Sequence, residues 1–219
     1  MVPLRESVRR LLLRVLYHWD RVRLAWLRWL VPGLDIHPTA TPAFASARFV
    51  IEPGGKLRIA AGAATERRSG ALSFLVHAGG EIVIEEGAWL RTEVEPVVLA
   101  AFRGARLVVG REALLNGCSV SAKREVVIER KAMVGPGSRV YDADQHDLDG
   151  ERREVVAPVR IGELAWVASD VTVMRGVTIG AHAVVGARSL VTRDVPPHTL
   201  VYGTPAEPRG VVGDRTGAR

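Results

Sequence analysis

The sequence has little of what holds secreted or membrane-spanning domains together. Its 219 residues include one cysteine, Cys118, which excludes an internal disulfide and favours a reducing compartment. No uncharged apolar run reaches the length of about 18 residues needed to cross a bilayer. The first apolar run is interrupted by arginines and lacks a small-residue cleavage site. We therefore expect no signal peptide and a cytoplasmic protein.

Aromatic residues are scarce as well, at 5% of the chain, and a six-residue repeat of aliphatic residues supplies the expected core instead. The residues that open each repeat are Ile161, Val167, Val173, Ile179, Val185 and Val191. Four positions after each comes a small or β-branched residue: Ala165, Val171, Val177, Ala183, Ser189 and Val195. A period of six matches neither a helix nor a flat strand. It matches a parallel β-helix, in which each unit is a short strand plus a corner and each coil buries its aliphatics against the next.

The same spacing recurs with interruptions in the first part of the chain. The pairs are Ile36 with Ala40, Ile59 with Ala63, Ile84 with Ala88, Val109 with Ala113, and Ile128 with Ala132. Three six-residue units make one triangular coil, so each longer interval predicts a coil with an extruded loop. The longest excess lies between Val140 and Ile161 and is the most polar stretch. We predict a mainly β fold, with one β-helix domain over residues 35–206 and a flexible tail over residues 207–219.

Residues 1–34 form a separate basic unit. Apolar residues recur at helical spacing over residues 4–31, namely Val8, Leu11, Val15, Trp19, Val22, Trp26 and Trp29, with most arginines off this stripe. Pro32-Gly33 ends the predicted helix. The helix either caps the β-helix or a neighbouring subunit, or lies on the inner face of an anionic membrane as a peripheral contact. Both interpretations need the same pattern. No nucleic-acid recognition motif accompanies the arginines, so we expect no nucleic-acid binding.

Five segments of the C-terminal half carry a family resemblance. They are Val159-Arg-Ile-Gly162 followed by Trp166, Gly176-Val-Thr-Ile-Gly180, Ala183-Val-Val-Gly-Ala187, Val191-Thr-Arg-Asp-Val-Pro196 and Gly203-Thr-Pro-Ala206. The chain resembles the hexapeptide-repeat acyltransferases, in particular the maltose, galactoside and nodulation O-acetyltransferases and the exopolysaccharide acetyltransferases. The resemblance is dense over residues 128–206, looser over 36–121 and absent from the N-terminal helix. It implies a left-handed β-helix, a homotrimer, and acetyl transfer from acetyl-CoA to the hydroxyl of a sugar or glycan.

The resemblance also implies a donor site along the last coils. The positions that match it are Trp166, Ala168, Ala187, Arg193 and Pro205. Arg193 replaces a lysine of the family; it would pair with a phosphate of the donor or remain an exposed corner cation. Ala168 replaces a glycine and bears on how closely the pantetheine arm approaches the backbone. Trp166 would contact the donor or serve only as a wall of the groove.

The acceptor site is expected in the polar loop. Acetyl transfer to a hydroxyl needs a base, and histidine titrates near neutral pH. His146 lies among acidic residues of the loop and is the candidate base. The alternative interpretation is a solvated surface histidine. By the resemblance, His146 matches the catalytic histidine and Asn116 the asparagine that contacts the acceptor. Asp142 or Asp144 would bind the acceptor or orient the imidazole, and the sequence does not choose between them.

The other candidate residues are weaker. Asp147 and Asp149 are lesser candidates for sugar contacts, and Cys118 has no basic neighbour in sequence, which argues against an acyl-enzyme. The remaining histidines are interpreted as structural or surface residues: His18, His37, His77, His182 and His198.

Three rival functions compete with acetyl transfer to a hydroxyl. A γ-type carbonic anhydrase shares this fold but needs several histidines on zinc, and His146 has no close second histidine. We therefore expect no metal. A non-enzymatic β-helix scaffold is a second possibility. Acetylation of the nitrogen of an amino sugar or nucleotide sugar is the third, because the same base serves an amine.

Overall fold

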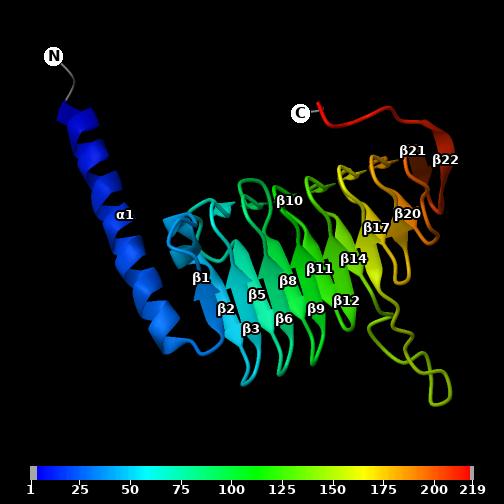
Figure 1. The fold of residues 1–219 in the computed structure, drawn as a ribbon, viewed down its shortest axis with the longest axis horizontal. Coiled ribbons are helices and arrows are strands. Elements are labelled where there is room, and N and C mark those ends of the chain that lie inside the picture. The colour runs from blue at the N-terminus through cyan, green and yellow to red at the C-terminus, as the bar shows by residue number, and fades with distance from the viewer. Residues whose placement is uncertain (1–3, 218–219) are drawn as a thin grey trace.

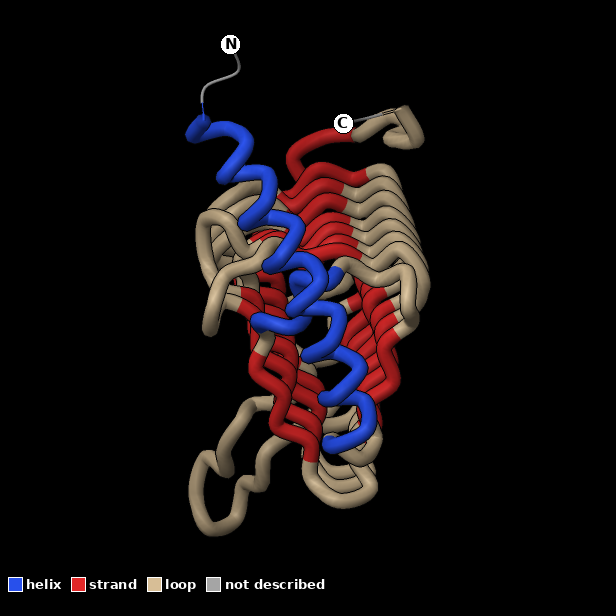
Figure 2. The backbone as a smooth tube through the Cα atoms, turned by 90° about the vertical axis from the view of Figure 1, so that its left-hand side faces the viewer, coloured by secondary structure: helices blue, strands red, loops and turns tan. Residues whose placement is uncertain are grey.

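The computed structural model describes residues 4–217. Three parallel sheets wind around a common axis as a triangular prism, with one helix across its N-terminal end (Figure 1, Figure 2). We name each sheet after its first strand. From coil to coil the chain passes from the β1 sheet to the β4 sheet, then to the β2 sheet, and back.

The strands of each sheet follow one another by about one coil. The β1 sheet contains β1 (Leu34–Ile36), β3 (Lys56–Ile59), β6 (Glu81–Ile84), β9 (Arg106–Val109), β12 (Glu125–Ile128), β15 (Val159–Ile161) and β18 (Thr178–Ile179). The β4 sheet contains β4 (Ala64–Thr65), β7 (Trp89–Arg91), β10 (Leu114–Asn116), β13 (Met133–Val134), β16 (Trp166–Val167), β19 (Val184–Val185), β21 (Thr199–Gly203) and, antiparallel to it, β22 (Ala206–Val211). The β2 sheet contains β2 (Arg48–Ile51), β5 (Leu72–Val76), β8 (Val97–Ala101), β11 (Ser119–Ala122), β14 (Arg139–Tyr141), β17 (Thr172–Val173) and β20 (Leu190–Val191).

The six-residue repeat builds the interior. In the β1 sheet, the residues that open the repeats pair in register from coil to coil: Ile36, Ile59, Ile84, Val109, Ile128, Ile161 and Ile179. All seven are at most 2% exposed. The predicted parallel β-helix, with one coil per interval, is therefore confirmed. The small corner residues also face the interior, since Ala40, Ala63, Ala88, Ala113 and Ala132 are at most 1% exposed.

Helix α1 (Leu4–Leu30) covers the open end of the prism together with the short 3₁₀ helix η1 (Pro42–Ser46). It does so with a different face from the one that the sequence pattern emphasised. Leu24 is buried and Leu27 packs against the core, and the buried Asp20 carboxylate accepts a hydrogen bond of 2.7 Å from Arg67. The stripe of valines, leucines and tryptophans remains exposed. Within residues 4–217, no helix has the length and apolar character to cross a membrane.

The C-terminal segment is more structured than the predicted tail over residues 207–219. Strand β22 extends the sheet to Val211, and the chain then runs back along the prism as the C-terminal arm (residues 212–217; Figure 1). Backbone pairing with β21 explains the difference, because it satisfies the polar groups of the strand. Residues 1–3 of the predicted N-terminal unit and residues 218–219 of the predicted tail lie outside the described residues.

Two edges of the prism matter for the site. The loop edge is formed by the corners where the chain leaves the β2 sheet for the β1 sheet, and it carries the extruded loop, residues 142–158 (Figure 1, lower right). The Asn116 edge is formed by the corners where the chain leaves the β4 sheet for the β2 sheet. The β2 sheet separates these two edges.

Candidate active site

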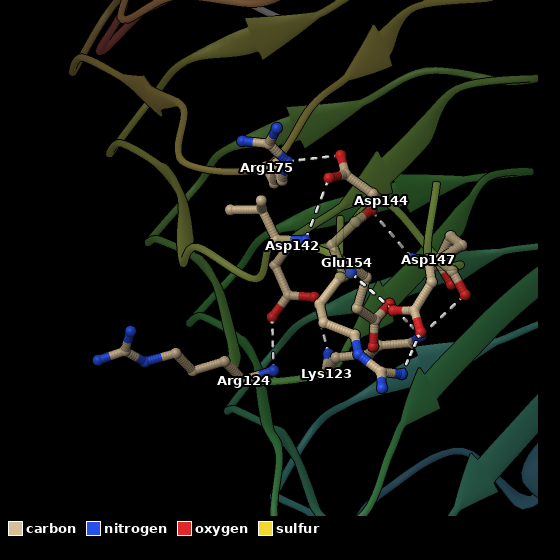
Figure 3. A network of polar contacts seen from close by, with 11 residues as sticks. Lys123, Arg124, Asp142, Asp144, Asp147, Glu154 and Arg175 are labelled. Atoms are coloured by element: carbon tan, nitrogen blue, oxygen red, sulfur yellow. Dashed lines mark hydrogen bonds and ion pairs between the residues drawn. The ribbon is translucent and has the colours of Figure 1, made fainter. Parts of the chain in front are cut away.

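The extruded loop is anchored by a buried carboxylate at its first residue. The side chain of Asp142 is fully buried, and its two oxygens accept the backbone N–H groups of Lys123, Arg124 and Glu125 at 2.7–2.8 Å (Figure 3). Hydrogen bonds to a charged acceptor are about twice as strong as neutral ones. Asp142 therefore fixes the start of the loop to the preceding coil.

Further along the loop, two aspartates hold its two arms together. Asp144 pairs with Arg175 of the following coil at 2.5 Å and accepts the N–H of Val155 at 3.1 Å. The hydrogen bond from Arg175 is the main cause that lowers the pKa of Asp144, against the opposing effect of burial. The N–H of Glu154 is the main cause that lowers the pKa of Asp147. The loop is thus a closed polar network (Figure 3).

His146 lies on the exposed part of this loop. Within the described residues, neither of the aspartates expected to orient its imidazole does so. The oxygens of Asp142 are taken by three backbone N–H groups, and those of Asp144 by Arg175 and Val155. Both carboxylates shape the loop, so in the single chain they support His146 only indirectly. The imidazole faces solvent, where a substrate or another subunit can reach it.

Asn116 ends strand β10 on the Asn116 edge. Its Oδ1 atom is buried and has no hydrogen-bond partner among the described residues. Gly117 follows with φ +52°, and a Cβ there would lie 2.7 Å from the Cβ of Glu95, so only glycine fits this turn after Asn116. A buried carbonyl without a donor costs about 1–3 kcal/mol. The arrangement therefore provides an acceptor for a hydrogen bond from outside the chain.

The predicted donor-site residues divide between the two edges. Ala168, Ala187 and Pro205 follow β16, β19 and β21 and so share the Asn116 edge with Asn116. Arg193 follows β20 and lies exposed on the loop edge, as the loop of His146 does. Six residues of extended chain span at most about 20 Å, which limits the width of the face between the edges. One chain alone does not bring His146 and Asn116 to the same edge.

The predicted donor-site residue Trp166 lies on the outer face of the β4 sheet, where Arg215 of the C-terminal arm contacts it and leaves it partly exposed. The guanidinium of Arg215 stands 5.3 Å from the ring centre of Trp166, and its Nε donates to the carbonyl of Leu164 at 3.1 Å. His182, whose ring stacks on that of His198 at 4.6 Å, accepts the backbone N–H of Arg215 at 3.0 Å. These two histidines, interpreted from the sequence as structural or surface residues, thus hold the arm.

Two further groups bear on rival chemistries. Burial raises the pKa of the Cys118 thiol to about 12, so this residue is a poor nucleophile at neutral pH. Among residues 4–217, no cluster of three or more His, Cys, Asp or Glu side chains is placed to hold a metal ion.

Two curated proteins are similar to this chain over part of its length. The galactoside O-acetyltransferase of Escherichia coli is 30% identical over 136 residues, which cover 60% of this chain and 64% of that protein. Nodulation protein L of Rhizobium meliloti is 42% identical over 112 residues, which cover 49% of this chain and 61% of that protein. The resemblance to the hexapeptide-repeat acyltransferases is confirmed. The chain spans less than two thirds of either relative, and no protein-family model matches it.

Among solved structures, the polySia-specific acetyltransferase NeuO has a TM-score of 0.51 and 21% identity, and the match covers 80% of this chain and 87% of that one. This likeness concerns the fold. The predicted class, a left-handed parallel β-helix of hexapeptide repeats with an N-terminal helix, is confirmed.

The sequence analysis did not single out three residues that shape this acyltransferase-like chain: Lys123, Arg175 and Arg215. Two of them could have been found. Val120, Val140 and Val173 pair in register, so the repeat places Lys123 and Arg175 on the loop edge, one coil before and one coil after Asp142. No repeat covers the C-terminal arm, and nothing in the sequence pairs Arg215 with Trp166.

Proposed function

We propose that this protein is an acetyl-CoA-dependent O-acetyltransferase that acts on a hydroxyl of a sugar or glycan. The observation that carries the proposal is the buried Oδ1 of Asn116, which has no donor among the described residues and lies on the edge shared with Ala168 and Ala187. A sugar hydroxyl supplies such a donor. The similarity to a galactoside O-acetyltransferase supports the same acceptor chemistry.

In this mechanism His146 is the general base. It takes the proton of the acceptor hydroxyl while Asn116 holds the acceptor through its amide oxygen, and a backbone N–H stabilises the negative charge that develops on the acetyl oxygen. Bound acetyl-CoA supplies the thioester: the new bond joins the acceptor oxygen to the acetyl carbon as the carbon–sulfur bond breaks. The protonated His146 then returns its proton to the departing sulfur.

We further propose a homotrimer in which each site is shared between two copies. His146 and Arg193 lie on the loop edge, whereas Asn116, Ala168, Ala187 and Pro205 lie on the Asn116 edge. A neighbouring prism that sets its Asn116 edge against the loop edge would complete the site. Arg193 would then pair with a phosphate of the donor, as an exposed guanidinium can.

The first test is the rate of acetyl-CoA consumption, corrected for hydrolysis, across sugars, nucleotide sugars and glycolipids. His146→Ala should lower kcat by about 10²-fold or more, because the base is lost. Asn116→Ala should lower kcat/KM by about ten-fold, since one hydrogen bond to the acceptor is lost. Glu151→Gln changes an exposed charge of the same loop and should leave turnover unchanged.

A mixing experiment tests the shared site. If His146 and Asn116 act across subunits, co-expression of His146→Ala with Asn116→Ala chains should restore about one quarter of the activity, by random pairing in a closed ring. No restoration would place both residues of a site in one chain.

In the substrate screen, turnover only with amino sugars would indicate N-acetylation. Absence of CoA binding in calorimetry would favour a scaffold and end the enzyme proposal.

A further inference from the structure

Helix α1 has two faces with different environments. One face, with Asp20, Leu24 and Leu27, packs across the end of the prism. The opposite face carries the predicted stripe, because residues recur at 100° around an α-helix. On that face Trp19, Val22 and Trp26 are 63–66% exposed and Trp29 is 81% exposed. The packing that holds the helix therefore leaves its most apolar side in contact with solvent.

The exposed stripe is long and continuous. It runs from Val8 to Leu30, along a helix about 40 Å in length. Near its C-terminal end, Trp19, Val22 and Trp26 help to line a shallow groove of about 460 Å³. The helix lies across the end of the prism (Figure 1, Figure 2). Because Leu24 and Leu27 pack against the prism from the opposite face, the stripe points away from the coils. A flat surface can meet this face without touching the rest of the molecule.

The charge of the helix is as distinctive as its apolar side. It contains seven arginines and two acidic residues, a net charge of +5, whereas the whole chain carries +6. Both acids are paired: Glu6 with Arg10, and the buried Asp20 with Arg67, each at 2.7 Å. At 100° per residue, Arg23 borders the stripe on one side and Arg14 on the other. The apolar stripe is therefore flanked by cations on both sides.

We propose that α1 is an interfacial helix that docks the protein on an anionic lipid bilayer. Tryptophan rings favour the headgroup level of a membrane, and flanking arginines pair with lipid phosphates. The positive charge of the arginines indicates that the partner surface is negatively charged. A second copy of the chain would set these arginines against one another, whereas an anionic surface neutralises them. This docking surface is independent of the acetyl-transfer site, which lies on the edges of the coils.

The test is co-sedimentation of the full chain with vesicles. Binding to phosphatidylcholine that contains about one third phosphatidylglycerol should be at least about ten-fold tighter than to phosphatidylcholine alone, and should weaken as salt rises. The triple variant Trp19→Ser/Trp26→Ser/Trp29→Ser should lose binding. Trp89→Ser, which changes an exposed tryptophan of the prism, should keep it. Arg9→Gln/Arg14→Gln/Arg23→Gln should lose the preference for anionic lipid.

Two readouts keep the outcome decisive. Brominated lipids should quench tryptophan fluorescence of the wild type but not of the triple variant, and circular dichroism should show that the variant stays folded, because all three side chains are exposed. Wild-type protein that stays in the supernatant with anionic vesicles would overturn the proposal. The proposal would also be overturned if the triple substitution left vesicle binding unchanged and only reduced the mass of the protein in lipid-free sedimentation. A second copy of the chain would then occupy the stripe.

Discussion

The stacked coils and the segments attached to them are held in different ways. In the coils, aliphatic residues repeat every six positions, and each is buried against its counterpart in the next coil. The three attachments are α1, the loop of residues 142–158 and the C-terminal arm. Each of these has a polar anchor: Asp20 with Arg67 for α1, Asp142 with three backbone N–H groups for the loop, and Arg215 with the carbonyl of Leu164 for the arm.

This difference separates global stability from local order. Burial in the coils is spread over many equivalent residues, so a single deletion weakens the whole stack through its neighbours. A polar anchor holds only its own segment, so its loss should release that segment and leave the coils intact. The residues proposed for function lie mainly on the attachments and edges, where the six-residue repeat constrains the sequence least.

The largest expected effect comes from the interior of the coils. Ile128 is fully buried and lies in register between Val109 and Ile161. Ile128→Ala should lower the free energy of unfolding by about 2–5 kcal/mol, since a cavity remains where the side chain was. Leu148→Ala, on the exposed part of the loop, should change it by less than about 0.5 kcal/mol. Urea unfolding followed by circular dichroism compares the two, and equal losses would show that the coils hold no special share of stability.

The next effect is local. Asp142→Ala removes the acceptor of the N–H groups of Lys123, Arg124 and Glu125. The loop is then released, and water can reach these N–H groups, so they are not left buried without a partner. We expect fast hydrogen exchange at these three amides and rapid proteolysis within residues 143–157, with a nearly unchanged urea midpoint. Glu151→Ala, which changes an exposed side chain of the same loop, serves as the control. A midpoint shift as large as that of Ile128→Ala would contradict the separation.

The coils were predictable because their physics repeats. Ile128 and the excess between Val140 and Ile161 follow from spacing alone, since every coil poses the same packing problem. Asp142 was harder. It stands in an acidic run with Asp144 and Asp147. Only Asp142 lies at the corner directly after β14, and there its side chain is buried. In the sequence, the three carboxylates look alike.

The covered face of α1 was not predictable for a similar reason. The tryptophan stripe has the stronger amphipathic signal, yet Asp20 and Leu24 form the contact. From the sequence, Asp20 is expected to be exposed to solvent, because its partner Arg67 lies 47 positions later. Contacts between the repeat and what lies outside it depend on pairs distant in sequence, which no local period encodes.

A smaller effect concerns the C-terminal arm. Arg215→Ala removes the guanidinium above Trp166 and its hydrogen bond to Leu164, each worth about 0.5–1.5 kcal/mol. We expect early proteolytic loss of residues 212–219 and an altered fluorescence of Trp166, with intact coils. Arg188→Ala, a highly exposed arginine with one contact at 4.0 Å, should do neither. If the arm resists proteolysis in both variants, strand β22 rather than Arg215 holds it.

The smallest effect is the pH dependence of the loop. Asp144 and Asp147 have lowered pKa values, chiefly through Arg175 and the N–H of Glu154 respectively. A lowered pKa in the folded state gives stability that is present above the ordinary aspartate pKa of about 3.9 and is lost only as the pH falls through the lowered value. Exchange protection of the Val155 amide, corrected for intrinsic rate, should therefore stay constant from pH 7 to about 4 and fall below it. In Asp144→Asn it should be weak at every pH, because the neutral amide holds neither Arg175 nor Val155 strongly. A fall between about pH 6 and 5 in the wild type would contradict the assignment of this protection to Asp144.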